Sequence, residues 1–422
     1  MGSTITNENI KIEGITYEHI ISVEINQKIG QHGEADLELE VEPAVGAALT
    51  SGIEVHRYVS IIAVNNGQSQ VIFCGVIANA GMSAENQYPV LSVKLLSTSY
   101  LLDKEKRTRS YQIMSLTHEQ VMNMAVENKA TIHFEATDSP IGGWILQNNE
   151  TNWEFIKRMA SRCKAVVTVD VTQKQPTLTI GIPNMLLTGG IGKSQDGNLV
   201  KNSKTALERG ELVTTPSYGE AKDFTNTPYH NPLSEGLMLT GVVQDVQKEK
   251  VKVFFDSIDS EYDPGTDNWF EYATPFATNG GEYGSGFYWM PEQGDRVRVF
   301  LPTAEEAAAF AFGSVSVSPL DNPVEAKWRV PNGQEILFTE DGIRITCQES
   351  SIYIDMNINS PIGISVFSDQ NINIEEAETI LIEGDEGVTL FADNKVSLYS
   401  SETNVEFDKD MIVFQAEKFH IN

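Results

Sequence analysis

Apolar and polar residues alternate in short runs over the first hundred residues, a pattern typical of β-strands with one buried face. The strictest alternation lies at 35–41. Three later runs, at 59–64, 71–77 and 90–96, are more continuously apolar and predict more deeply buried strands. We therefore predict a small β-barrel at the start of the chain.

The spacing becomes helical after about residue 106. Thr117 and Gln120 stand at the positions of a capping box, in which both side chains satisfy free amides at a helix N-terminus. A second helix is predicted over 153–163, where apolar residues again recur at helical intervals. The residues predicted to share the buried face of the first helix are Val121, Met124 and Ala125.

Strand-like runs return near residue 166 and continue to about 317. Five or so short strands within about 80 residues are typical of an OB-type barrel. The helix-favouring segment 304–310 is predicted to form only a loop or a single turn within that barrel. The predicted domains are a first barrel (1–105), a helical insertion (106–165), a second barrel (166–233), an OB-fold barrel (234–320) and a repeat segment (331–422).

The repeat segment contains apolar pairs that recur every eight residues, each pair followed by five mostly polar residues. A fixed period predicts a stacked array of strands. One chain could coil with several such faces per turn, or three identical chains could intertwine around a dry core. The predicted core residues are Ile364, Val366, Ile372, Ile374, Ile380, Ile382, Val388, Leu390, Val396 and Leu398.

The chain carries a formal net charge of −29, and residues 331–422 hold 18 acidic and 4 basic side chains. Such a surface repels phosphate backbones, so we expect no nucleic-acid partner. The seven histidines are dispersed and the three cysteines form no C-x-x-C pair, so we expect no metal ion and no cofactor. No nucleophile–base motif is present, and no signal peptide is evident, so we expect a non-enzymatic protein assembled in the cytoplasm.

An aromatic, glycine-rich segment at 272–290 leads into Pro291-Glu292-Gln293-Gly294-Asp295 and then a strand, which resembles the OB-fold signature of the VgrG family and its phage baseplate relatives. Segments 73–77 and 147–160 resemble strand and helix motifs of that family's hub. The resemblance implies a homotrimer with two hub barrels, an OB-fold and an intertwined β-helix needle. It also implies that the hub joins the inner tube and baseplate proteins, and that the needle pierces the envelope of a target cell.

Two other functions remain open from the sequence: a trimeric receptor-binding tail fibre or adhesin, and a polysaccharide-cleaving β-helix enzyme. No lysozyme domain fits between the barrel and the repeat, because fewer than twenty residues separate them. The repeat pattern continues to the last residues, which predicts that a separate tip protein similar to the PAAR family covers the end of the needle. The predicted contacts with that protein are Phe419, His420, Ile421 and Asn422.

Overall fold

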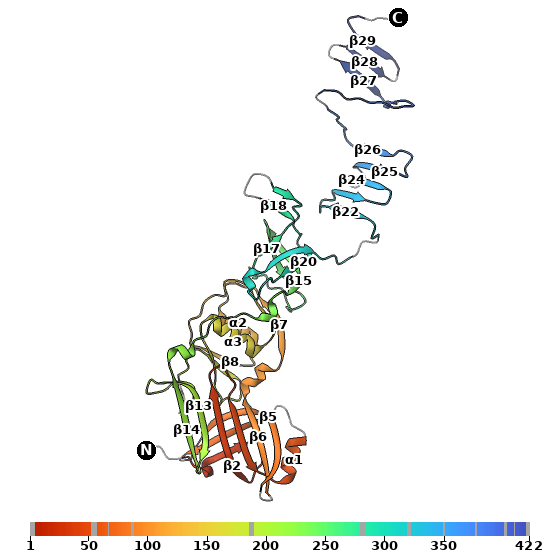
Figure 1. The fold of residues 1–422 in the computed structure, drawn as a ribbon. Coiled ribbons are helices and arrows are strands. Elements are labelled where there is room, and N and C mark those ends of the chain that lie inside the picture. The colour runs from red at the N-terminus through yellow and green to blue at the C-terminus, as the bar shows by residue number, and fades with distance from the viewer. Residues whose placement is uncertain are drawn as a thin grey trace. The chain divides into compact units, whose positions relative to one another are not determined.

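The computed structural model divides the chain into two compact units, which we call unit 1 (Met1–Val317) and unit 2 (Ser318–Asn422). It describes residues 5–51, 57–65, 67–85, 88–184, 190–278, 284–318, 322–348, 351–375, 378–400, 403–408 and 410–418. Both units are built mainly of β-strands, as the sequence predicts (Figure 1).

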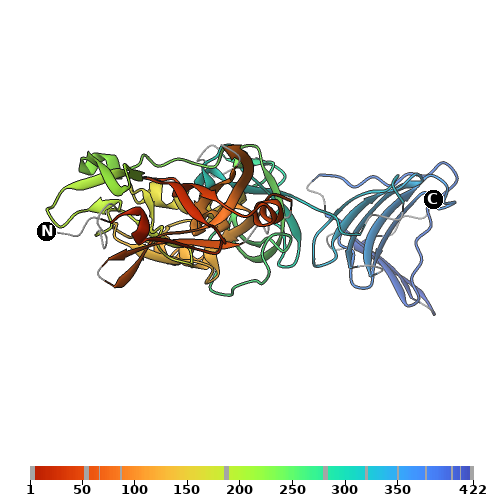
Figure 2. The same cartoon turned by 90° about the horizontal axis from the view of Figure 1, so that it is seen from below.

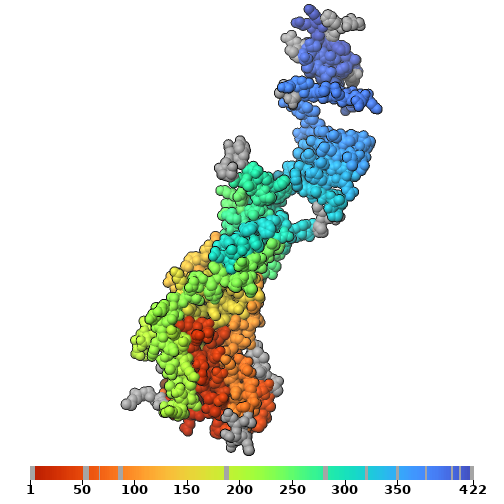
Figure 3. Space-filling model, viewed as in Figure 1, coloured from red at the N-terminus to blue at the C-terminus, as the bar shows by residue number. Residues whose placement is uncertain are grey.

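A nine-stranded sheet begins unit 1, and its core consists of alternate apolar side chains from the predicted strands. Short pairings of residues 5–7 with 210–212 join the N-terminal segment to the far edge of this sheet. In Figure 3 the yellow-green surface of the last two strands lies against the red surface of the first ones. The strands are β1 (Ile10–Glu13), β2 (His19–Lys28), β3 (Glu34–Glu40), β4 (Tyr58–Asn65), β5 (Gln68–Glu85), β6 (Tyr88–Ser97), β12 (Gly192–Lys193), β13 (Leu199–Glu208) and β14 (Glu211–Gly219), with helix α1 (Pro43–Ser51) between β3 and β4.

The two predicted helices lie beside a second apolar core. Thr117 and Gln120 form the capping box at the start of α2, and Thr151 and Glu154 form another at the start of α3. Met124 is half exposed, so its predicted place on the buried face is wrong; Met122 is buried there, since α2 packs along 118, 121, 122, 125 and 126. The elements are α2 (His118–Val126), α3 (Asn152–Arg162), β8 (Thr131–Phe134), β10 (Val167–Val169), β11 (Thr177–Ile180) and the pair β7 (Lys106–Tyr111) and β9 (Ile145–Thr151).

Residues 166–233, predicted as a second barrel, are divided between two sheets. Strands β10 and β11 join β8 next to the helices, whereas β12, β13 and β14 extend the nine-stranded sheet through the pairing of β13 with β2. This pairing was not predictable from the polar composition of 186–232, because β13 and β14 form a mostly solvated hairpin with only a few buried positions.

A closed five-stranded barrel completes unit 1, in the order β15-β16-β17-β21-β20. Its core includes Val243, Val253 and Val299. The segment 304–310, predicted as a loop or single turn, contains the short 3-10 helix Glu306–Ala308 and ends at the first residue of the last barrel strand. The strands are β15 (Met238–Gln247), β16 (Lys250–Phe254), β17 (Phe270–Ala273), β20 (Arg296–Phe300) and β21 (Phe310–Ser314), and a hairpin of β18 (Phe276–Thr278) and β19 (Gly284–Gly286) interrupts them.

Unit 2 contains two antiparallel meanders, in which each strand pairs with the next one along the chain. The first meander has five strands and the second has three. The strands of the first meander can be seen side by side in Figure 2. The strands are β22 (Ala326–Arg329), β23 (Glu335–Phe338), β24 (Gly342–Gln348), β25 (Ile352–Asn357), β26 (Ile364–Ser368), β27 (Lys395–Ser400), β28 (Thr403–Asp408) and β29 (Ile412–Gln415).

Candidate assembly surface

The first meander of unit 2 has one continuous apolar face. Directly paired residues of antiparallel strands project from the same side of a sheet, as do residues two apart on a strand. The registers therefore align two apolar columns across all five strands. The columns are Trp328, Ile336, Ile345, Ile354 and Val366, and Ala326, Phe338, Ile343, Met356 and Ile364.

The second meander repeats this arrangement with three strands. Its two columns run across β27, β28 and β29, and they consist of Val396, Phe407 and Ile412, and of Leu398, Val405 and Phe414. Several of these side chains are largely exposed in the single chain, such as Leu398 at 52% and Ile412 at 57%. An uncovered apolar face of this extent marks an interaction surface.

The strictest part of the repeat lies between the two meanders. The described residues from 369 to 394 contain no strand and no helix. The predicted core residues of this stretch are about half exposed or more: Ile372, Ile374, Ile380, Ile382, Val388 and Leu390. The other four predicted core residues lie on strands, Ile364 and Val366 on β26 and Val396 and Leu398 on β27.

Strand pairing within unit 2 determines which of its surfaces are left for other chains to cover. An isolated repeat strand would leave both of its edges unpaired unless other strands fill them. Within each meander the chain instead pairs its own strands, so most edges are already satisfied. What remains uncovered is the apolar face of the meanders and the strandless segment 369–394.

The OB signature forms a tight turn at the entrance to β20. Glu292 and Asp295 exchange hydrogen bonds, with the Glu292 amide 2.9 Å from Asp295 Oδ2 and the Asp295 amide 3.1 Å from the Glu292 carbonyl. Gly294 lies between them at a φ of +95°, a conformation that favours glycine. The Gly294 amide donates to the Val243 carbonyl, which fastens the turn to β15, and Pro291 is buried beneath it.

An aromatic cluster lies directly before this turn. Phe287, Tyr288 and Trp289 are 59%, 50% and 42% exposed, and the Tyr288 ring meets Phe276 of β18 edge to face. Exposed neighbouring aromatic rings are typical of protein interfaces. The four predicted tip contacts, Phe419, His420, Ile421 and Asn422, lie outside the described residues.

A buried ion network joins helix α3 to the five-stranded barrel. Arg158 is fully buried and binds Glu150 through two nitrogens, at 2.8 and 2.7 Å, and Glu306 through a third at 3.0 Å. Arg162 binds the other Glu306 oxygen at 2.7 Å. The Trp144 indole also donates to the Glu306 carbonyl at 2.8 Å. Glu306 therefore fastens the barrel to the helical region.

Electrostatics favour the charged forms of this network. Burial disfavours the Arg158 guanidinium, but the bonds and charges of Glu150 and Glu306 outweigh it and raise the pKa of Arg158. Burial likewise disfavours the Glu306 carboxylate, but the charges of Arg162 and Arg158 lower the pKa of Glu306. Sequence reasoning missed this network because Arg158 and Glu306 are 148 residues apart.

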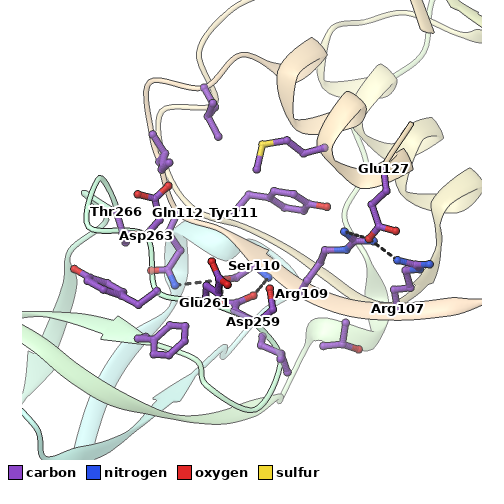
Figure 4. Close-up of a pocket in the computed structure, with 18 of the residues that line it drawn as sticks. Arg107, Arg109, Ser110, Tyr111, Gln112, Glu127, Asp259, Glu261, Asp263 and Thr266 are labelled. Atoms are coloured by element: carbon purple, nitrogen blue, oxygen red, sulfur yellow. Dashed lines mark hydrogen bonds and ion pairs between the residues drawn. The ribbon is translucent and has the colours of Figure 1, made fainter. Parts of the chain in front are cut away.

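A cleft of about 860 Å³ lies between β7 and the segment after β16 (Figure 4). Ser110 donates its amide and hydroxyl to the two oxygens of Asp259, at 2.8 and 2.6 Å. Arg107 and Arg109 both bind Glu127 on the other side. Burial raises the pKa of Asp259. No histidine stands among the described residues that line the cleft, and the Ser110–Asp259 pair connects β7 with the barrel.

Comparison with solved structures finds a similar fold in a type VI secretion complex that contains VgrG. A structure of the Francisella PdpA–VgrG complex in its half-lidded form aligns over 86% of this chain and 87% of that chain, with a TM-score of 0.52 and 8% identity. The chain has a VgrG-like fold. No protein-family model and no curated protein sequence matches the chain.

Two further structures are similar over smaller parts of the VgrG-like chain. The E. coli c3393 protein is a type VI secretion system component with structural similarity to the T4 bacteriophage tail proteins gp27 and gp5. It is 12% identical and aligns over 73% of this chain and 99% of its own, with a TM-score of 0.47. The 43 kDa tail protein of Shewanella oneidensis prophage MuSo2 is 10% identical. It aligns over 53% of this chain and 100% of its own, with a TM-score of 0.39.

Proposed function

We propose that this VgrG-like chain is the central hub and spike of a contractile injection system, and that three copies form the working particle. Unit 1 would connect the inner tube and baseplate proteins to unit 2, which would form the needle that pierces a target envelope. The observation that carries this proposal is the uncovered apolar face of the two meanders, on a chain with a VgrG-like fold.

Three chains account for the features of unit 2 better than one. Three meanders that turn their apolar faces inward would enclose both pairs of columns in a dry core and leave the acidic side chains in solvent. The segment 369–394 would gain strand partners from the other two chains, which would account for the exposure of its predicted core residues in one chain. The aromatic cluster Phe287–Trp289 would pack near the same axis.

The spike would have no catalytic activity of its own. The cleft beside β7 contains a serine and a carboxylate, but Asp259 binds the Ser110 amide as well as its hydroxyl, which fits a structural link between β7 and the barrel, and no histidine stands among the described lining residues. A receptor-binding fibre or adhesin is the alternative function. The Glu306 network favours the spike, because buried ion pairs fasten the barrel to the helical part of the hub, and a spike would have to transmit force across this junction.

A separate tip protein, similar to the PAAR family, would cover the end of the needle. Strand β29 is the outer member of its sheet, and its outer edge pairs with no described strand. Such an edge is a ready site for pairing with another chain. The residues that follow it, 419–422, would supply the contacts.

The oligomeric state tests the proposal directly. Light scattering of the purified chain should give a mass near 140 kDa, three times the 46.6 kDa of one copy. Replacing Ile380 and Ile382 with Asp would put six charges into a dry core, at several kcal/mol each, and should abolish the trimer.

Leu381→Asp is the matched control, because Leu381 lies between these residues and would project to the opposite side of a strand. It should leave the trimer intact. A stable monomer of the unmodified chain, or a trimer that tolerates the double replacement with unchanged thermal stability, contradicts the proposed needle.

A further inference from the structure

Three potential metal ligands meet in the helical part of unit 1, although they are distant in the sequence. A ring nitrogen of His118, a carboxylate oxygen of Asp138 and the sulfur of Cys163 all lie within 4.8 Å of one another. His118 is the first residue of α2, Asp138 belongs to the loop after β8, and Cys163 caps the end of α3. The sequence predicted no metal site because these three residues lie on separate elements and form no short motif.

We propose that His118, Asp138 and Cys163 bind a divalent transition metal ion of the zinc type. Thiolate, imidazole and carboxylate together are the donor set of tetrahedral zinc, whereas magnesium and calcium prefer oxygen alone. The inference concerns a part of the chain outside the needle and is independent of the proposed function.

Binding an ion would draw the three ligand atoms closer by up to about 1 Å. With bonds of about 2.0–2.3 Å, tetrahedral ligands stand roughly 3.4–3.7 Å apart. His118 Nδ1 and Asp138 Oδ1 are 4.0 Å apart, so a displacement of a few tenths of an ångström brings this pair to the separation of two tetrahedral ligands. Cys163 and Asp138 are both partly exposed, which leaves room for a water molecule as the fourth ligand.

The existing hydrogen bonds orient the ligands. Asp138 Oδ1 accepts from the amides of His118 and Ser139, at 3.1 and 2.9 Å, and this holds the carboxylate against the start of α2. Its second oxygen accepts no hydrogen bond within the described part of the chain. His118 Nδ1 lies 2.9 Å from the Ser139 carbonyl, and a carbonyl can only accept, so Nδ1 carries the proton in the metal-free form. Binding of the ion through Nε2 retains that hydrogen bond, whereas binding through Nδ1 breaks it and requires the tautomer with its proton on Nε2.

Charge around the site is divided. The positive end of the α2 dipole opposes a cation, and the Asp138 carboxylate and the negative end of α3 offset it. Burial, with a smaller contribution from Asp138, raises the pKa of the Cys163 thiol to about 11. The metal-free thiol therefore holds its proton at neutral pH, and metal binding releases that proton to solvent.

Cobalt(II) titration of the full chain tests the site. One cobalt ion per chain should bind, with the visible bands of tetrahedral cobalt and a thiolate-to-cobalt charge-transfer band, and zinc should displace it. Cys163→Ser should remove the charge-transfer band. Asp138→Asn keeps the oxygen that caps α2 and should weaken binding at least about tenfold, a loss of about 1.4 kcal/mol.

Cys74→Ser and Cys347→Ser are the matched controls and should keep the cobalt spectrum. A second measurement covers the case in which Cys163→Ser fails to fold: zinc should protect Cys163 of the unmodified chain from alkylation, as measured by mass spectrometry. The absence of a thiolate band and of zinc protection overturns the proposal, as does a spectrum unchanged in the Cys163→Ser chain.

Discussion

Arg158 and Glu306 show how much of unit 1 depends on single side chains. A fully buried guanidinium is costly to desolvate, and Arg158 is stable only because two carboxylates and the Leu146 carbonyl satisfy its donors. Glu306 in turn has Arg158, Arg162 and the ring of His230 around it. Removing either Arg158 or Glu306 leaves the buried charges of the other side chains with fewer partners.

Glu306→Gln should lower the free energy of unfolding of unit 1 by about 3 kcal/mol, because it leaves the buried Arg158 with one carboxylate instead of two. Denaturant unfolding followed by tryptophan fluorescence measures this, since Trp144 contacts Glu306 directly. The matched control is Glu305→Gln: the Glu305 side chain is 65% exposed, and its replacement should change the free energy by less than about 0.5 kcal/mol. Equal effects of the two replacements would show that the network contributes little.

The same carboxylate predicts a dependence on pH. The pKa of Glu306 is lower in the folded chain than its ordinary value of 4.5. Its contribution to stability is therefore complete above about pH 4.5 and is lost as the pH falls through the lower folded value. The stability difference between the unmodified chain and Glu306→Gln should be constant from pH 6 to 8 and shrink below about pH 4. A difference that grows on acidification would contradict the assigned direction of the shift.

At the scale of elements, local signals predicted local structure well. Thr117 and Gln120 identified the start of α2, and the alternating run at 35–41 became β3, because caps and alternation act over a few residues. Pairing over longer distances was not predictable in this way. The attachment of β13 to β2 depends on a polar hairpin with few buried positions. The columns of the first meander are not spaced by a constant eight residues.

The turn at Gly294 gives a prediction at this scale. An alanine Cβ is disfavoured at a φ of +95°, so Gly294→Ala should destabilise the barrel by about 1 kcal/mol. Thermal unfolding measures the loss. Gln293→Ala alters the neighbouring position, which has no positive φ, and should be close to neutral. An equally stable Gly294→Ala chain would show that the turn can relax.

At the scale of the whole molecule, the two units have different sources of stability. Unit 1 contains three apolar cores that one chain closes by itself. Unit 2 pairs its backbone within each meander but leaves its apolar columns uncovered. None of the helices in the described part of the chain combines the length and apolar character needed to span a membrane. In the proposed spike, unit 1 would therefore fold before the chains associate, and unit 2 would bury its apolar columns only on association.

Removal of residues 419–422 tests the proposed tip contact while leaving strand β29 in place. The shortened chain should still form trimers, but a PAAR-like tip protein should be lost from most assembled particles, as counted by quantitative mass spectrometry. Replacing the same four residues with Gly-Ser-Gly-Ser, which keeps the chain length, is the companion variant and should give the same loss. Normal occupancy in both variants would place the tip protein elsewhere.

The long separation between Arg158 and Glu306 also affects how the chain is made. Ribosomes add about 5–20 residues per second, so the 148 residues between them take roughly 7–30 s to synthesise. Helix α3 can form within microseconds of its emergence, and Arg158 and Arg162 then lack the Glu306 carboxylate until residue 306 is made. A nascent chain at this stage is a natural substrate for chaperones, and slowed translation between codons 158 and 306 should prolong its exposure to proteases.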